Sequence, residues 1–312
     1  MNRAWAIAFV AFAVSSVLGA KPYADGDTSG CGIEHDFWGL PHHLDIESSG
    51  QKRSYYIHLP WDYDPNHHYP VVFGFHGAGT SGHYFDVDTL LSLPLFSSSK
   101  IMIYPDGVHG TWAGPSYAHT TIKQDLQFVW DILAHLRAKY CINSARVYAA
   151  GFSNGAGFLD TLACNATVGG EFAAFAPAAG VYYTEPDGAC KPARNTTPFL
   201  EFHGMKDTSA PYDGGKGHGG KLPSIEDWLD LWADRNGCGN KPTQSDFEEG
   251  KVHHLSYECK GEQGKGALQH WRVDDMGHVW PAKHPNLSGG KPAHISAGLL
   301  AMQFFDQFVR PA

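Results

Sequence analysis

The sequence lacks several features that would place it in other classes of protein. Basic residues are not in excess, since 23 Lys and Arg stand against 32 Asp and Glu and the formal net charge is −9. This balance argues against nucleic acid and anionic membranes as partners. HExxH and CxxC spacings do not occur, and the six cysteines are scattered. We therefore expect no metal site.

Long apolar runs are missing beyond the first twenty residues. Residues 1–20 contain one early arginine, Arg3, an apolar core over residues 4–14 and small residues at the end. This layout is typical of a secretory signal peptide, and the apolar core is too short to cross a bilayer. We expect residues 1–20 to be that signal peptide and residues 21–312 to form a single domain. The mature protein is then secreted, soluble and extracellular.

Cysteines and glycosylation sequons agree with export. Six cysteines allow three disulfides in an oxidising compartment. Cys238 and Cys259 flank one short segment and are the expected pair, while the pairing of the others stays open: Cys31, Cys141, Cys164 and Cys190. Three Asn-x-Ser/Thr sequons predict surface glycosylation sites at Asn165, Asn195 and Asn286.

Strand and helix patterns alternate along most of the chain. Short apolar runs predict strands over residues 54–59, 71–75, 101–104, 146–150, 172–176, 198–202 and 267–273. Amphipathic spacing predicts helices over residues 122–140, 155–164, 225–232 and 295–308, the third with Ser224 as its N-cap. Such alternation implies an α/β fold with a mainly parallel sheet covered by helices on both faces. The glycine-rich residues 214–220 lack the GK[ST] ending of a phosphate-binding loop, so we expect a flexible surface loop there.

The sequence Gly151-Phe152-Ser153-Asn154-Gly155 follows a predicted strand and precedes a predicted helix. A serine at a sharp strand-to-helix turn is the nucleophile elbow of α/β-hydrolases. Gly151 and Gly155 suit it because strand and helix must approach closely there. The free N–H groups at the helix N-terminus favour negative charge beside the serine. We therefore expect Ser153 to be a nucleophile.

A serine nucleophile needs a base and an orienting acid, and in the α/β-hydrolase order the acid and then the histidine follow the serine. Asp207 lies just past the strand over residues 198–202. His278 lies in the loop after the strand over residues 267–273. Rival groups are less suitable because the acids do not directly follow a strand and the histidines lie inside strands: Glu185, Asp187, Asp213, His253, His254 and His270. The expected catalytic residues are Ser153, Asp207 and His278.

An oxyanion formed at Ser153 needs N–H donors. The segment Phe75-His76-Gly77-Ala78-Gly79 follows a predicted strand, where the second donor of this fold arises. We expect the backbone N–H groups of Ala78 and Asn154 to form the oxyanion hole.

Longer motifs resemble a known family. FHGAG, IYPDG, the Thr111-Trp112 pair, ARVYAAGFSNG, FAAFAP, FLEFHGMKD and GHVWP are together similar to secreted fungal feruloyl esterases of types B and D. They are more distantly similar to polyhydroxybutyrate depolymerase-like esterases. The resemblance runs from about Cys31 to Phe308 and implies an α/β-hydrolase whose triad is Ser153, Asp207 and His278.

The resemblance also implies a function. It is release of ferulic or p-coumaric acid from plant cell-wall polysaccharides such as arabinoxylan or pectin, or from small cinnamoyl esters, without a cofactor. Trp112 and Trp280 lie beside predicted catalytic segments, so either ring could bind a phenolic group or fill the core. An acetylxylan esterase or a polyester depolymerase would keep the same triad. An inactive carbohydrate-binding protein with this fold is the non-enzymatic alternative.

Overall fold

The computed structural model describes residues 29–97, 99–183, 190–239, 241–261, 263–289 and 291–311. The expected signal peptide and the rival acids Glu185 and Asp187 lie outside the described residues. Among the helices of the described ranges, none is both long enough and apolar enough to cross a membrane.

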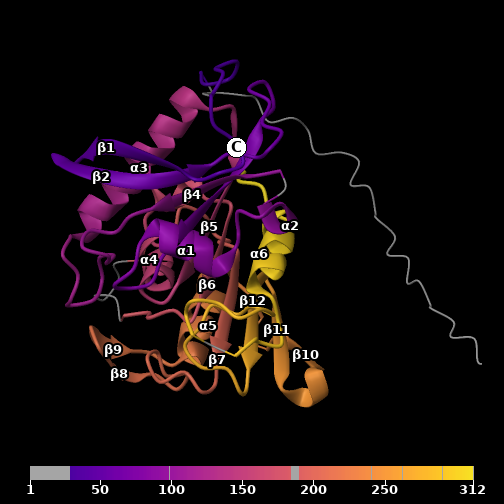
Figure 1. The fold of residues 1–312 in the computed structure, drawn as a ribbon. Coiled ribbons are helices and arrows are strands. Elements are labelled where there is room, and N and C mark those ends of the chain that lie inside the picture. Colours follow the sequence, from indigo (N-terminus) through magenta and orange to yellow (C-terminus); the bar gives the residue numbers. More distant parts are fainter. Residues whose placement is uncertain are drawn as a thin grey trace, which may run out of the picture.

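A large mixed sheet organises the molecule (Figure 1). Its strands lie in the order β1-β2-β4-β3-β5-β6-β7-β12-β11-β10. The central strands from β4 to β12 in that order pair in parallel, whereas β1, β2, β11 and β10 pair antiparallel at the two edges. This arrangement, with helices on both faces, is the α/β-hydrolase fold that the sequence predicts.

The strands and helices have the following bounds. The strands of the large sheet are β1 His42–Ser48, β2 Gln51–His58, β3 Tyr69–Phe75, β4 Ile101–Pro105, β5 Ile142–Phe152, β6 Ala174–Ala178, β7 Phe199–Gly204, β10 Thr243–Phe247, β11 Val252–Glu258 and β12 Lys265–Val273. The α-helices are α1 Gly82–Thr89, α2 Pro94–Ser97, α3 Ile122–Lys139, α4 Asn154–Ala163, α5 Ile225–Arg235 and α6 Ala297–Phe305. The described residues also form two short 3-10 helices, η1 Gly169–Glu171 and η2 Glu248–Gly250.

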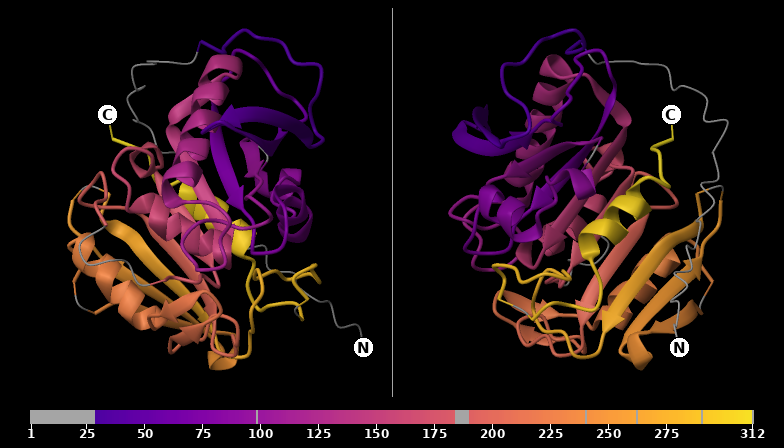
Figure 2. Two further views of the ribbon diagram at one scale, coloured as in Figure 1. Left: turned by 90° about the vertical axis from the view of Figure 1, so that its left-hand side faces the viewer. Right: turned by 45° about the vertical axis from the view of Figure 1, so that its right-hand side comes forward.

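Two apolar cores lie on the two faces of the sheet. Helices α3, α4 and α5 pack on one face, where Phe128, Phe158 and Trp232 are fully buried. Helices α1, α2 and α6 pack on the other face, where Phe305 of α6 stacks on Tyr148 of β5. Figure 2 shows the yellow α6 covering this second face. Burial on both faces explains why the central strands are continuous apolar runs rather than alternating ones.

The expectation of a flexible loop at residues 214–220 is wrong. Gly215–Gly217 (β8) and Gly220–Leu222 (β9) form an antiparallel hairpin. Backbone and side-chain bonds hold its tip, because Ser116 N donates to Gly219 O and Gly219 N donates to the Tyr183 hydroxyl. A side chain at Gly219 would collide with Pro115, since an ideal Cβ would lie 2.3 Å from the proline Cβ. The glycines here therefore permit close packing rather than mobility.

Three disulfides tie distant segments together. The structure pairs Cys238 with Cys259, as the sequence leads us to expect, and joins Cys31 to Cys141 and Cys164 to Cys190. The Cys31–Cys141 bond spans 110 residues and anchors the N-terminal segment to the start of β5, whereas Cys238–Cys259 spans only 21.

Replacing each of these two disulfides by a serine pair tests the effect of that difference. In the loop-closure model the long loop contributes about 5 kcal/mol to the free energy of unfolding and the short loop about 3 kcal/mol. We expect Cys31→Ser/Cys141→Ser to lower the free energy of unfolding in urea more than Cys238→Ser/Cys259→Ser. Equal losses, or the reverse order, would contradict this expectation.

Candidate active site

The turn between β5 and α4 has the geometry of a nucleophile elbow. Ser153 adopts φ 53° and ψ −114°, a conformation that non-glycine residues rarely occupy. An ideal Cβ at Gly155 would lie 2.2 Å from the carbonyl oxygen of Phe75, and one at Gly151 would lie 2.9 Å from the carbonyl carbon of Gly155. Both glycines are therefore required where the helix crosses close to the strand ends.

The structure brings Ser153, His278 and Asp207 together. The His278 Nε2 atom lies 2.8 Å from Ser153 Oγ, and His278 Nδ1 lies 2.7 Å from Asp207 Oδ2. The Asp207 side chain is fully buried, whereas the His278 side chain is 19% exposed. One face of the imidazole packs against Phe152, with 5.0 Å between ring centroids. The remaining rivals lie elsewhere: His253, His254 and His270 occupy β11 and β12, and Asp213 is exposed before the hairpin.

Backbone contacts between two loops place the acid beside the histidine. Strand β7 pairs in parallel with β12, and Gly204 lies opposite Val273 at the carboxyl ends of both strands. Beyond that point Lys206 N donates to Met276 O at 3.0 Å. An ideal Cβ at Gly204 would lie only 2.1 Å from Met276 O, so this close approach requires glycine.

Asp207 is held as an ionised acceptor. Its Oδ1 accepts the N–H groups of Ser209 and Ala210 at 2.8 and 2.7 Å, while Oδ2 faces His278. Burial by itself raises the pKa of Asp207, but hydrogen bonds and charge from His203 and His278 outweigh burial and hold the pKa well below its ordinary value. The carboxylate can therefore orient the imidazole and stabilise its positive charge without taking the proton.

The segment after β3 lies beside Ser153. An ideal Cβ at Gly77 would lie 3.4 Å from Ser153 Cβ, so the backbone of residues 77 and 78 borders the nucleophile. His76 braces this segment, because its Nδ1 lies 2.8 Å from Gly77 O and its Nε2 accepts Gly107 N–H at 2.9 Å. Burial lowers the pKa of His76, which agrees with a neutral ring. The role of His76 was missed from the sequence, although its place directly after a strand end was a usable signal.

Of the two roles left open for Trp112, binding a phenolic group or filling the core, the structure favours the core. Its side chain is completely buried, stacks on Phe158 and donates from Nε1 to His76 O at 3.2 Å. The main chain of Trp112 instead pairs with the Asn154 side chain, which accepts Trp112 N–H at 2.7 Å and donates to Trp112 O at 3.1 Å. Trp112 therefore fixes the first residue of α4 and the segment after β3 relative to each other.

Trp280 is also a core residue rather than a substrate contact. It is 1% exposed and packs edge-on against Phe85, with 5.4 Å between ring centroids. Its carbonyl oxygen accepts the amide of Asn286 at 2.8 Å. The ring thus anchors residue 280 in the core, and its main chain bonds to the loop at Asn286.

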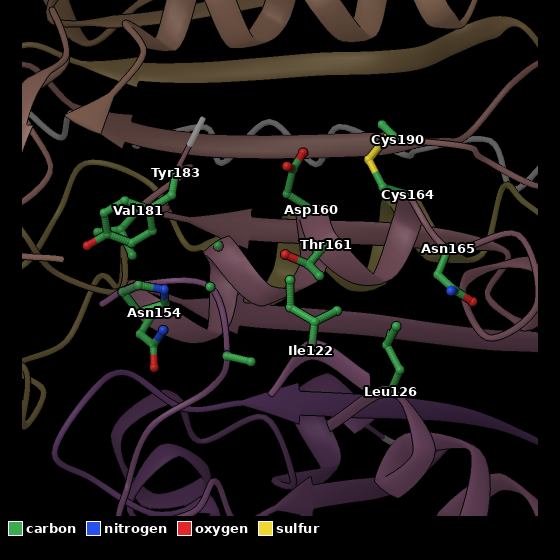
Figure 3. A pocket seen from close by; sticks show the side chains of 14 residues that line it. Ile122, Leu126, Asn154, Asp160, Thr161, Cys164, Asn165, Val181, Tyr183 and Cys190 are labelled. Carbon is green, nitrogen blue, oxygen red and sulfur yellow. A yellow bond between two sulfur atoms is a disulfide. The ribbon is translucent and has the colours of Figure 1, made fainter. Parts of the chain in front are cut away.

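Two cavities flank the elbow. One, of about 250 Å³, is lined by Gly77, Ala78, Ser153, His278 and Leu287, among others. The other, of about 210 Å³, is lined by Asn154 and Gly157 of the first turn of α4 but not by Ser153. Figure 3 shows that it runs along α4, from Asn154, Val181 and Tyr183 at one end to Asn165 and the Cys164–Cys190 disulfide at the other. We call them the histidine-side cavity and the helix-side cavity.

The remaining predicted sites are placed as follows. The three sequon asparagines are partly or fully exposed, and Asn165 lines the helix-side cavity. Within the described ranges, one group of three possible metal ligands lies close together, Cys31, His68 and Cys141. Its two sulfur atoms form a disulfide, so they do not offer thiolate ligands.

Comparison with known proteins agrees with this fold. No model of a known protein family matches the chain. The solved acetyl xylan esterase from Aspergillus awamori has the same fold, with a TM-score of 0.60 at 16% identity over 85% of this chain and 99% of that one.

Among curated proteins, a probable feruloyl esterase C from Aspergillus niger is 30% identical over 52% of this chain and 58% of its own length. One from Aspergillus clavatus is 29% identical over 68% of this chain and 73% of its own length. The match thus spans less than two thirds of the A. niger protein. The chain is thus similar to fungal feruloyl esterases over part of its length, and it has an α/β-hydrolase fold.

Asn154→Ala tests the bridge to Trp112. The variant keeps the backbone N–H at residue 154 but leaves two buried main-chain groups of Trp112 unpaired, so we expect the free energy of unfolding to fall by about 2 to 4 kcal/mol. The exposed Asn66→Ala is the matched control, with an expected change below about 0.5 kcal/mol. Urea unfolding of both variants gives the comparison. Equal decreases in the free energy of unfolding of Asn154→Ala and Asn66→Ala would show that the bridge to Trp112 does not stabilise the elbow.

Proposed function

We propose that the protein is an extracellular serine esterase that releases cinnamic acids, such as ferulic or p-coumaric acid, from plant cell-wall polysaccharides. The observation that carries the proposal is the chain of two short hydrogen bonds from Ser153 through His278 to Asp207. The relatives from A. niger and A. clavatus, both described as probable feruloyl esterases, support the substrate class. The three disulfides support an extracellular location.

The proposed reaction is acyl transfer through a covalent intermediate. Ser153 Oγ attacks the ester carbonyl as its proton passes to His278 Nε2, and Asp207 stabilises the imidazolium. The N–H groups of Ala78 and Asn154 bind the oxyanion, each lowering the barrier by roughly 3 kcal/mol. His278 then protonates the departing sugar oxygen. Water attacks the acyl-enzyme with His278 again as base, and the cinnamic acid leaves.

The two cavities fit the two halves of such an ester. The departing oxygen must lie within reach of His278 Nε2, so the sugar occupies the histidine-side cavity, which His278 lines. The acyl group then extends into the helix-side cavity, whose walls include the apolar Val181, Ile122 and Leu126. Thr161 and Tyr183 add hydroxyl groups that suit a phenol.

A substrate panel with wild type and Ser153→Ala tests the activity. We expect wild type to hydrolyse methyl ferulate and methyl p-coumarate. We expect the variant to lose on the order of 10⁴-fold or more in kcat, because the nucleophile is gone. Acetylated xylan and hydroxybutyrate oligomers complete the panel. If wild type hydrolyses acetylated xylan or hydroxybutyrate oligomers faster than the cinnamate esters, the proposed substrate is wrong. If wild type is inactive but binds xylan, the protein is a carbohydrate-binding protein rather than an esterase.

Two bulky substitutions test which cavity holds the acyl group. Thr161→Phe narrows the helix-side cavity, so we expect the ratio of kcat/KM for methyl ferulate to that for methyl acetate to fall by about tenfold, which corresponds to about 1.4 kcal/mol. Leu287→Trp in the histidine-side cavity is the matched control. It should leave that ratio nearly constant and instead disfavour feruloylated oligosaccharides relative to methyl ferulate. If Leu287→Trp instead lowers the ratio and Thr161→Phe does not, the acyl group occupies the histidine-side cavity and the sugar the helix-side cavity.

A further inference from the structure

Next to the catalytic acid lies a buried group of titratable side chains that the reaction above does not use. Glu201, His203 and His270 are all fully buried. Glu201 and His203 are on β7, and His270 is on the neighbouring β12. Buried charges are costly unless they are paired and hydrogen-bonded, so this group calls for a physical reason.

The contacts of His203 define its protonation. Its Nε2 lies 2.8 Å from Ala210 O, and a carbonyl oxygen only accepts, so this nitrogen carries a hydrogen. Its Nδ1 lies 3.0 Å from Glu201 Oε1. Two further polar groups lie beside Glu201: His270 Nδ1 is 2.6 Å from Oε2 at ion-pair distance, and the Tyr182 hydroxyl donates to Oε1 at 3.5 Å. A carboxylate surrounded in this way is an ionised acceptor, so His203 Nδ1 also carries a hydrogen.

We propose that His203 is a positioning residue: a permanently protonated imidazolium, balanced by Glu201, that holds Asp207 ionised and aimed at His278. The Nε2 atom of His203 lies 3.4 Å from Asp207 Oδ2, the same oxygen that faces His278. His203 also binds the carbonyl of Ala210, whose N–H binds Asp207 Oδ1. The imidazolium therefore fixes the carboxylate both through its charge and through Ala210, whose backbone N–H donates to that carboxylate.

The charges of the group explain why Glu201 and His203 are buried beside Asp207. Glu201, His203 and Asp207 together carry a net charge of −1, which is the charge of a single carboxylate beside His278. The contacts with His203 at the same time fix the orientation of Asp207. Burial lowers the pKa of His203, but Asp207 and Glu201 outweigh burial and raise the pKa to about 10. Burial raises the pKa of Glu201, and the two histidines reverse that effect and lower it. The charged and titratable groups around His203 are Glu201, Asp207, Tyr182, Tyr212, His270, Arg272 and His278.

The inference rests on the proposed esterase function for its kinetic part, and its first test does not need activity. Nitrogen NMR of the histidine rings in the intact wild-type protein at pH 8 should show both nitrogens of His203 protonated. The ring signal of His203 is assigned by its absence from the spectrum of His203→Gln. If His203→Gln does not fold, the signal is assigned as the histidine resonance that shifts most in the spectrum of Glu201→Gln. A neutral His203 ring at pH 8 would overturn the proposal even in an active enzyme. A protonated ring in an enzyme without esterase activity would overturn the proposed function alone.

Kinetics then test the positioning role with His203→Gln, Glu201→Gln and the double variant. We expect His203→Gln to lower kcat/KM for methyl ferulate by on the order of 10- to 100-fold, by analogy with the loss on replacing the hydrogen-bonded partners of metal-bound histidines. The acid limb of the pH profile should move up by about one unit, because a positive charge near the base is removed. The double variant should lose less than the product of the two single losses, because it removes a cation together with its anion.

His253→Gln is the matched control. His253 also lies between two carboxylates, with Nδ1 2.7 Å from Asp246 and Nε2 3.2 Å from Asp274, but it is on β11 and does not contact the triad. The acid limb of the pH profile of His253→Gln should stay at the wild-type position. An unmoved acid limb in His203→Gln, or independent effects of the two single substitutions, would reduce His203 to a structural residue and overturn the positioning role.

Discussion

The parallel pairing of β7 with β12 is the constraint on which the site depends. It sets Gly204 opposite Val273, so the two loops that follow start side by side. Lys206 N then bonds to Met276 O, and the chain reaches Asp207 and His278 in contact although 71 residues separate them. Because this backbone bond joins the two loops a few residues beyond the strand ends, the two side chains have little freedom. The buried acid and the partly exposed base therefore keep hydrogen-bond distance without substrate.

The nucleophile meets this pair through a second rigid element. Ser153 occupies a strained backbone conformation that persists because the surrounding structure fixes it. Gly155 lies against Phe75 O, and the Asn154 side chain binds both main-chain groups of Trp112. The same contacts fix the segment after β3, so the nucleophile and the backbone N–H groups beside it are held by one set of interactions. Preorganised donors of this kind stabilise charge without reorganisation during the reaction.

Much of this could be predicted from the sequence because it follows local rules. Apolar runs and helical spacing indicated the central strands and the helices α3, α4, α5 and α6, but not α1 and α2. The serine between two glycines, after a strand and before a helix, favoured a sharp turn. The edge strands β1 and β10 were missed because their residues are mostly exposed and polar, which leaves no apolar pattern to detect. The hairpin at residues 215–222 was missed because glycine runs usually indicate mobility, while here they allow contact with Pro115 and Tyr183.

The two tryptophans show where sequence reasoning reaches its limit. A large aromatic ring beside a catalytic segment has the same chemistry whether it stacks on a ligand or on Phe158, and only the partner distinguishes the two roles. The buried histidines show the same limit, because His203 and His253 each lie between two carboxylates. What separates them is distance from the triad and the degree of burial, which together decide whether a charge is felt at the reacting atoms or is screened by solvent. Position in the fold, rather than residue type, therefore turns one of two similar ion clusters into part of the candidate active site.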